Sequence, residues 1–135
     1  MMLAATCLAL AIYHEARGEP VQGRYAVASV IMNRVASPHY PNNVCKVVAQ
    51  RKQFSFIRAG AGLEDLATPS GPTWRNSVRE ARATLNNLNP WPVKATHYHA
   101  VGILPPWAES GGLVPIAIIG NHVFYQPSTT TTTKE

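Results

Sequence analysis

Apolar side chains recur every three or four residues along the first third of the chain, which is the spacing of helices with a buried face. The first set predicts a helix over about residues 3–17 and comprises Leu3, Cys7, Leu8, Ala11 and Ile12. Gly18 and Pro20 end this helix, because glycine suits the position after a helix and proline cannot continue the turn. A second stripe predicts a helix from about Val21 to Ala36 and comprises Ala26, Val27, Val30, Ile31 and Arg34-Val35.

Turn-forming residues interrupt this spacing in the middle of the chain. Residues 37–43 form a loop, and Asn42 or Asn43 can cap the short helix that follows. That helix carries Val44, Val47 and Val48. Residues 53–72 are irregular, with several Gly and Pro, and a further helix is expected from about Thr73 to Leu88. Its predicted inner face consists of Val78, Ala81, Leu85 and Leu88.

The last third changes to alternating positions rich in β-forming residues. The segments Lys94–Val101 and Ile116–Tyr125 predict two or three short antiparallel strands. Helices followed by a small antiparallel sheet indicate an α+β fold. A chain of 135 residues, 46% of them apolar, has room for one core, so residues 1–126 are predicted to form one domain. The Thr-rich residues 127–135 are predicted to be a disordered tail.

The charge and the cysteine content leave several binding partners and both states of the cysteines possible. The net charge of +5 suits a polyanionic partner such as nucleic acid, anionic lipid or a cell wall bearing teichoic acid. The charges are scattered, so a solvated surface with a small positive excess explains them equally well. Cys7 and Cys45 can form a single bridge or remain a free pair. The apolar Met1–Tyr13 segment lacks a basic start and is too short to span a bilayer, so we interpret it as a buried helix without an export signal.

One carboxyl group stands at a position suited to acid chemistry. Glu15 lies on the last turn of the first predicted helix, just before Gly18. Partial burial and the negative end of the helix dipole both favour the protonated form of a carboxyl there. The plainer alternative is a surface pair between Glu15 and Arg17 or Arg24.

Several ordered sequence blocks resemble the cell wall hydrolase SleB family, which includes spore-cortex-lytic enzymes and phage-borne lysins. The main block runs from Ala11 to Pro20 and reads AIYHEARGEP, followed by Gly23, Ala26-Val27-Ala28, Val30-Ile31 and Asn33-Arg34-Val35. The later blocks are Tyr40-Pro41, Val44-Cys45-Lys46-Val47-Val48, Gln53-Phe54-Ser55, Ala95-Thr96-His97-Tyr98-His99, Pro105-Pro106-Trp107 and residues 119–125. Relatives often have a cysteine where this chain has Lys52, so a local bridge from that position to Cys45 is impossible here.

The resemblance implies a lysozyme-like α+β domain that cleaves the MurNAc–GlcNAc bond of peptidoglycan. The implied enzyme is generally a lytic transglycosylase, uses no metal or other cofactor, and has its catalytic acid at Glu15. Peptidoglycan is then the expected partner of a monomeric enzyme without nucleic-acid binding or stable membrane association. The expected setting is the bacterial cell wall, reached by a phage lysin through a permeabilised membrane.

A hydrolytic muramidase acting on the same bond is the alternative, and it needs a second carboxyl group to direct water. Glu64 or Asp65 in the irregular segment could supply it. Glu19 is expected to cap the next helix, with a smaller chance of touching substrate. Glu80 is expected to face outward beside Arg79.

Further residues in the matching blocks are candidates for substrate binding. They are Gln53, Phe54, Ser55, Tyr98, His99, Trp107, His122 and Tyr125. For each a structural role is the alternative: Phe54 in the core, the histidines as hydrogen-bonding groups of strands, and Trp107 as the residue that pins a loop.

Three other functional classes are alternatives to the glycosidase. A zinc amidase that cuts the peptide stem could use His97, His99 and His122 as ligands, although no acid partner for a metal-bound water is evident. A non-catalytic wall-binding module would leave the residues around Glu15 unexplained. A nucleic-acid binder is disfavoured because no basic helix or Gly-rich aromatic motif is present.

Overall fold

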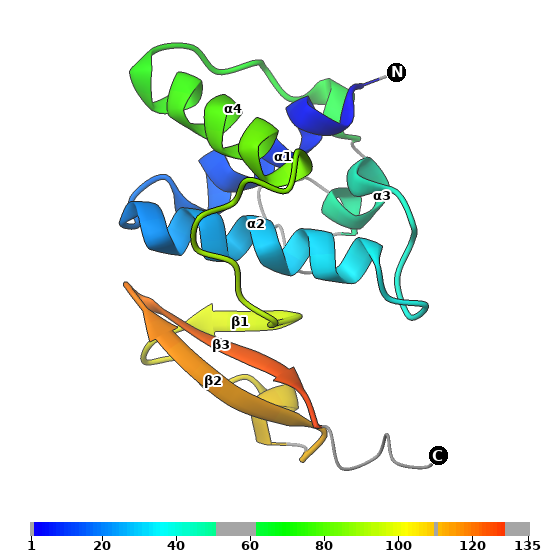
Figure 1. The fold of residues 1–135 in the computed structure, drawn as a ribbon, viewed down its shortest axis with the longest axis vertical. Coiled ribbons are helices and arrows are strands. Elements are labelled where there is room, and N and C mark those ends of the chain that lie inside the picture. The colour runs from blue at the N-terminus through cyan, green and yellow to red at the C-terminus, as the bar shows by residue number, and fades with distance from the viewer. Residues whose placement is uncertain (1, 51–61, 110, 129–135) are drawn as a thin grey trace.

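Four α-helices and a three-stranded antiparallel sheet make up the described part of the computed structural model, residues 2–50, 62–109 and 111–128 (Figure 1). The helices are α1 (Ala4–Ala16), α2 (Val21–Val35), α3 (Val44–Ala49) and α4 (Pro72–Leu85), and the strands are β1 (His97–Ala100), β2 (Leu113–Ile119) and β3 (His122–Pro127). Two short 3₁₀ helices, η2 (Leu63–Asp65) and η3 (Pro106–Glu109), lie in the connections. The α+β class predicted from the sequence is confirmed.

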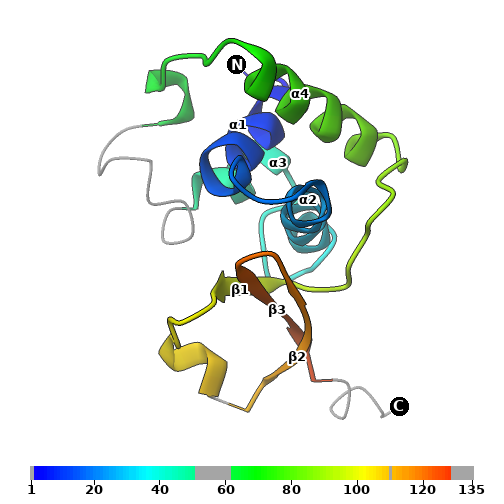
Figure 2. The ribbon, with the colours of Figure 1, turned by 90° about the vertical axis from the view of Figure 1, so that its left-hand side faces the viewer.

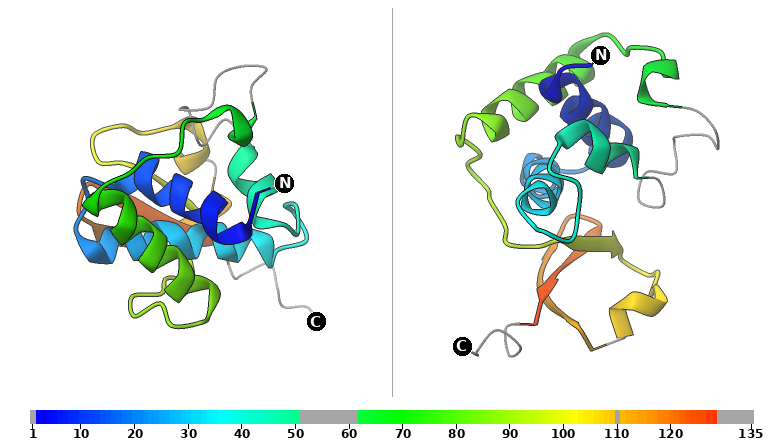
Figure 3. Two further views of the ribbon diagram at one scale, coloured as in Figure 1. Left: turned by 90° about the horizontal axis from the view of Figure 1, so that it is seen from above. Right: turned by 90° about the vertical axis from the view of Figure 1, so that its right-hand side faces the viewer.

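Helix α1 is the centre of the helical layer. It contacts α2, α3 and α4, and every residue from Cys7 to Ile12 is at most 2% exposed. A helix that is apolar on all sides is stable only when it is surrounded in this way. Leu3 is the exception among the positions predicted for the buried face of this helix, because it precedes the helix and is 74% exposed. The views in Figures 2 and 3 show α2 between α1 and the sheet.

Helix α4 packs on α1 and α2, and three of its four predicted inner residues lie against the core: Ala81 is buried, and Val78 and Leu85 are partly buried. The buried positions are Ser77, Glu80, Ala81 and Thr84, whereas Leu88 lies beyond the helix and is 70% exposed. The prediction that Glu80 faces outward is wrong, since the residue is 1% exposed. Its carboxylate accepts hydrogen bonds from Arg24 Nε and Nη2 at 2.9 and 2.8 Å. The buried carboxylate is thus neutralised by a cation on α2.

The sheet has the strand order β1-β3-β2. The three strands agree with the two or three predicted, and the predicted segment Ile116–Tyr125 contains parts of two of them, because Gly120 and Asn121 form a tight turn between β2 and β3. Gly120 has a φ of +58°, and a β-carbon there would lie within 3 Å of both Glu19 and Pro20. The turn is therefore packed directly against the loop that joins α1 to α2, and this contact requires glycine.

Cys7 and Cys45 form a disulfide that links α1 to α3, which decides between the two possibilities left open by the sequence. Strand β3 extends to Pro127, one residue into the predicted tail, and residues 129–135 lie outside the described part. None of the helices in the described part is long and apolar enough to cross a membrane.

The Arg24–Glu80 pair predicts a specific stability effect. Replacing Glu80 by Gln should lower the free energy of unfolding by about 2–4 kcal/mol, because Arg24 then loses its charged partner in a largely buried site. Chemical denaturation measures this difference. Glu64→Gln, which removes an exposed carboxylate, is the control and should change stability by less than about 0.5 kcal/mol. Equal stability of the two variants would contradict the assigned role of Glu80.

Candidate active site

The side chain of Glu15 lines a cleft of about 680 Å³ that is formed by residues of the helical layer and of the sheet. The cleft is lined by Glu15, Arg34, Tyr40, His97, Tyr98, His99, Ala100, Ile103, Pro105, Trp107 and His122. These residues come from the end of α1, from α2 and the loop after it, from β1 and the loop after β1, and from the start of β3. Four of the eight predicted substrate-binding residues lie here: Tyr98, His99, Trp107 and His122.

Glu15 makes one hydrogen bond that joins the two layers. The hydroxyl of Tyr98 on β1 donates to Glu15 Oε1 at 3.2 Å. Partial burial raises the pKa of Glu15 above its usual 4.5, and the hydrogen bond from Tyr98 lowers it by a smaller amount. Burial beside Glu15 also raises the pKa of Tyr98 well above 10, so its hydroxyl stays a donor. The alternative of a surface ion pair is wrong, because Arg24 binds Glu80 and Arg17 lies 4.5 Å from the ring centre of Tyr13.

Glu19 binds the turn between β2 and β3. Its carboxylate accepts hydrogen bonds from the backbone NH and the side-chain amide of Asn121 at 2.8 and 3.2 Å. It does not cap α2 as predicted, since the N-cap residue there is Pro20 and no side chain caps it. Burial lowers the pKa of His122, and its Nδ1 lies 3.8 Å from Glu19 and makes no hydrogen bond within the described residues. His122 is therefore neutral near pH 7, with its ring against that of Tyr98.

The opposite face of the sheet carries an aromatic cluster. The ring of Trp107 lies 5.0 Å from His97, 5.6 Å from His99 and 5.3 Å from Tyr125, measured between ring centres. These contacts fix the η3 loop to β1 and β3 and leave Trp107 half-buried at the cleft. Tyr125 is 6% exposed and binds His99 Nε2 through its hydroxyl at 2.9 Å. Tyr125 supports His99 and does not itself line the cleft.

Six residues that line the cleft were not predicted as site residues for the glycosidase, and Arg34, Tyr40 and His97 are the polar ones among them. Arg34 is 5% exposed, its Nε donates to the carbonyl of Thr96 at 2.7 Å, and its guanidinium lies 4.8 Å from the ring centre of Tyr40. Burial and the nearby Arg34 lower the pKa of His97 to about 4, so this ring is neutral at pH 7. The available signal was the charged Arg34 within the apolar stripe of α2, since a buried charge without a structural partner is costly.

Several residues predicted for the site are not among the described residues that line the cleft. Gln53, Phe54 and Ser55 lie outside the described residues, so their roles stay predictions. Glu64 and Asp65 belong to η2 and do not line the cleft; the Asp65 carboxylate instead accepts a hydrogen bond from the Gly62 backbone at 2.8 Å. Among the described residues that line the cleft, Glu15 is the one carboxylic acid.

The histidine arrangement does not match the proposed zinc ligands. The register pairs His97 with Tyr125 and Ala100 with His122, so His122 shares a face with Tyr98 and the opposite face carries His97 and His99. Within residues 2–50, 62–109 and 111–128, no group of three or more His, Cys, Asp or Glu side chains is arranged to hold a metal ion. The zinc-amidase alternative therefore has no ligand set in this part of the chain.

Comparison with known proteins confirms the resemblance seen in the sequence. A model of the Cell Wall Hydrolase family matches residues 18–125. The spore cortex-lytic enzyme of Bacillus subtilis is 33% identical over 117 residues, which are 87% of this chain and 35% of the relative. That of Halalkalibacterium halodurans is 38% identical over 120 residues, 87% of this chain and 33% of the relative. The chain thus spans about a third of the length of these curated relatives.

The fold of this chain is also similar to that of two solved catalytic domains. The catalytic domain of the Bacillus cereus SleB protein superposes with a TM-score of 0.66 at 31% identity, covering 90% of this chain and 88% of that one. The catalytic domain of the germination-specific lytic transglycosylase SleB from Bacillus anthracis gives 0.64 at 28% identity, covering 90% and 92%. The predicted lysozyme-like architecture is confirmed. The family match begins three residues after Glu15, so the role of Glu15 rests on its geometry.

The environment of Glu15 predicts its titration. Its pKa, measured by NMR of the side-chain carboxyl carbon, should lie above 4.5, and Tyr98→Phe should raise it further by removing a hydrogen bond that favours the carboxylate. Tyr25→Phe, a buried tyrosine with no hydrogen bond to Glu15, should leave it unchanged. A pKa at or below 4.5 in the unmodified protein would contradict the assigned effect of burial.

Proposed function

The chain belongs to the cell wall hydrolase family, and from this premise we propose that it cleaves peptidoglycan glycan strands at the MurNAc–GlcNAc bond with Glu15 as the acid. The observation that carries the proposal is the position of Glu15, half-buried in a cleft with its pKa raised. A carboxyl group with a raised pKa keeps its proton to higher pH and can deliver it to a leaving oxygen. Activity should accordingly fall as the pH rises through the pKa of Glu15, because only the protonated form can act as the acid.

The reaction we propose is a lytic transglycosylation. Protonated Glu15 donates its proton to the glycosidic oxygen as the bond from muramoyl C1 to that oxygen breaks. The resulting carboxylate then takes the proton from the C6 hydroxyl of the same sugar, and the C6 oxygen bonds to C1 to form the 1,6-anhydro ring. Glu15 ends the cycle protonated, so a single carboxyl group performs both steps and water is not consumed.

The set of acids favours this route over hydrolysis. A muramidase of either stereochemistry uses a pair of carboxyl groups flanking the bond. In the described lining of the cleft, Glu15 has no second carboxyl group near it. The similar Bacillus anthracis catalytic domain is that of a lytic transglycosylase, which agrees with the same route. The hydrolytic muramidase is the alternative, and the reaction products distinguish the two.

The remaining residues of the cleft are proposed to orient the sugar chain. Tyr98 holds the Glu15 carboxyl in place through its hydroxyl, and His122 packs on the ring of Tyr98. Trp107 and His99 offer a ring face and a polar edge beside them. Gln53, Phe54 and Ser55 stay predicted groove residues. The phage-lysin setting likewise stays a prediction from the sequence.

The decisive product analysis compares the unmodified protein with Glu15→Gln on purified peptidoglycan. The unmodified protein should release muropeptides with anhydro-muramoyl ends, lighter than the reduced ends by one water and two hydrogens. Glu15→Gln should release them at least about 100-fold more slowly, the scale of losing a general acid. Mass spectrometry of the digests measures both.

Two controls make the result specific. Glu64→Gln removes a carboxylate outside the cleft and should retain activity, and added EDTA should have no effect. Reducing muramoyl ends in place of anhydro ends would identify a muramidase and contradict the transglycosylase. Free stem peptides that depend on metal and not on Glu15 would contradict the proposed function altogether.

A further inference from the structure

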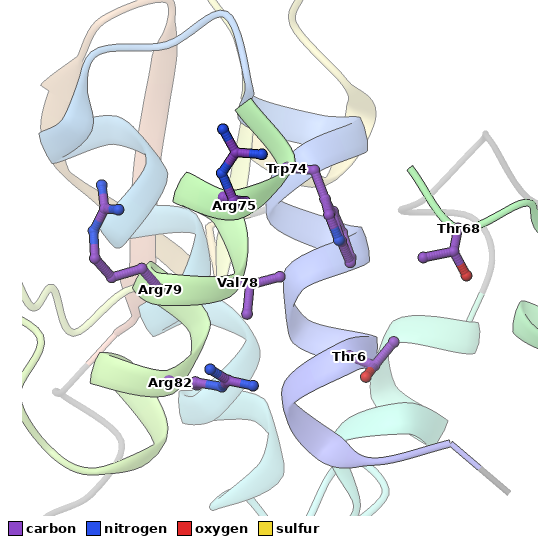
Figure 4. Close-up of a pocket in the computed structure, with 7 residues that line it drawn as sticks. All are labelled: Thr6, Thr68, Trp74, Arg75, Val78, Arg79 and Arg82. Carbon is purple, nitrogen blue, oxygen red and sulfur yellow. The ribbon is translucent and has the colours of Figure 1, made fainter. Parts of the chain in front are cut away.

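A second hollow, of about 750 Å³, lies between α1 and α4 and is shared with the loop that precedes α4 (Figure 4). It is lined by Thr6, Thr68, Trp74, Arg75, Val78, Arg79 and Arg82, and we call it the α4 groove. None of these residues lines the cleft of Glu15. Figure 4 shows Val78 and Arg82 directed from α4 toward α1.

Three arginines form a ladder along the outward side of α4, and Figure 4 shows Arg82 directed toward α1 and Arg79 directed away from it. Arg75, Arg79 and Arg82 are spaced i, i+4 and i+7, so they share one face of α4 and rise along it in steps of about 6 and 4.5 Å. All three are exposed, and no carboxylate belongs to the described lining of the groove. Like charges at these spacings destabilise a helix. A purely structural face would be expected to interleave acids, as helical surfaces commonly do.

The one acid on α4 does not relieve this charge. Glu80 points to the opposite side of the helix, where it is buried and bound to Arg24. Arg79 donates to Asn76 at 2.7 Å, which satisfies part of its guanidinium without neutralising it. The outward face of α4 therefore presents three positive charges in a row.

The groove also has an apolar wall. Val78 and the half-buried Trp74 line it, and the Trp74 ring meets the Tyr13 ring edge to face at 5.8 Å. An indole beside guanidinium groups suits a chain that carries both carbon-rich units and anions. A small free ion would contact the guanidinium groups alone and would have no use for this apolar wall.

The α4 groove and the catalytic cleft open on different sides of α1. Tyr13, which contacts the groove residue Trp74, and Glu15 are two positions apart and so point about 200° apart around the helix. A polymer could therefore lie in the groove while a glycan strand occupies the cleft.

We propose that the α4 groove binds an anionic phosphodiester polymer of the cell wall, the chemistry of teichoic acids. Guanidinium groups pair with phosphate oxygens through two parallel hydrogen bonds, and a ladder of them matches a chain with regularly repeated phosphates. Bound in this way, the enzyme stays on the wall while its cleft is free to engage glycan. The inference rests on the proposed function, because that function is what brings the protein to the wall.

The test uses Glu15→Gln protein, so that the wall is not digested during the measurement. Co-sedimentation measures binding to two wall preparations: walls that carry poly(glycerol phosphate), and the same walls stripped of phosphodiesters by hydrofluoric acid. Binding to the intact walls should be at least about tenfold tighter, the scale of losing charge-assisted hydrogen bonds to an anion. It should also weaken steeply with added salt.

A matched pair of variants assigns the binding to the groove. Arg75→Gln/Arg82→Gln should lose about tenfold in affinity for intact walls and show a shallower salt dependence. Lys46→Gln/Lys94→Gln also removes two exposed positive charges, lies outside the groove, and should lose less than about twofold. Equal loss in both variants would reduce the effect to net charge and overturn the proposal.

Other outcomes would also contradict the proposal that the α4 groove binds a phosphodiester polymer. Equal binding to stripped walls, or preferential binding to anionic lipid vesicles or duplex DNA at the same salt, would overturn the choice of polymer. Failure of the binding proposal is separable from failure of the proposed function. Release of anhydro-muropeptides from stripped peptidoglycan depends on Glu15 and should be unchanged in Arg75→Gln/Arg82→Gln.

Discussion

The hydrogen bond from Tyr98 to Glu15 connects the helical layer to the sheet at the point where the chemistry is proposed to occur. Burial of the Glu15 carboxyl raises its pKa, and Tyr98 of β1 is the residue of the sheet that is hydrogen-bonded to it. The same contact leaves one side of the carboxyl open to the cleft. A proton donor near neutral pH needs both conditions, a low local polarity and a path for substrate.

The position of the sheet depends in turn on a small set of close contacts. Gly120 allows the β2–β3 turn to approach the α1–α2 loop, and Glu19 in that loop binds the turn through Asn121. On the other side, Arg34 holds β1 through the carbonyl of Thr96. The buried α1, the disulfide to α3 and the Arg24–Glu80 pair fix the helices to which the sheet is attached.

Local patterns predicted the helices well and the polar contacts between elements poorly. The apolar period located α1 and α2, and Asn43 capped α3 as expected, because these features depend on neighbours within a few residues. The burial of Glu80 depends on Arg24, which is 56 residues away, and no local pattern carries that information. For the same reason Arg34 was seen as part of a stripe and not of the cleft. Glu15 was identified from its place at a helix end and from the resemblance, whereas its partner Tyr98 required the fold.

The central claim is that a glycan strand lies in the cleft with its scissile oxygen at Glu15. A crystal structure of Glu15→Gln with a bound MurNAc–GlcNAc oligosaccharide tests this most directly. A glycosidic oxygen should lie about 2.6–3.2 Å from the side chain at position 15, with the sugars running between β1 and α2. An oligosaccharide bound in the α4 groove, or in the cleft with every glycosidic oxygen out of reach of position 15, would contradict it.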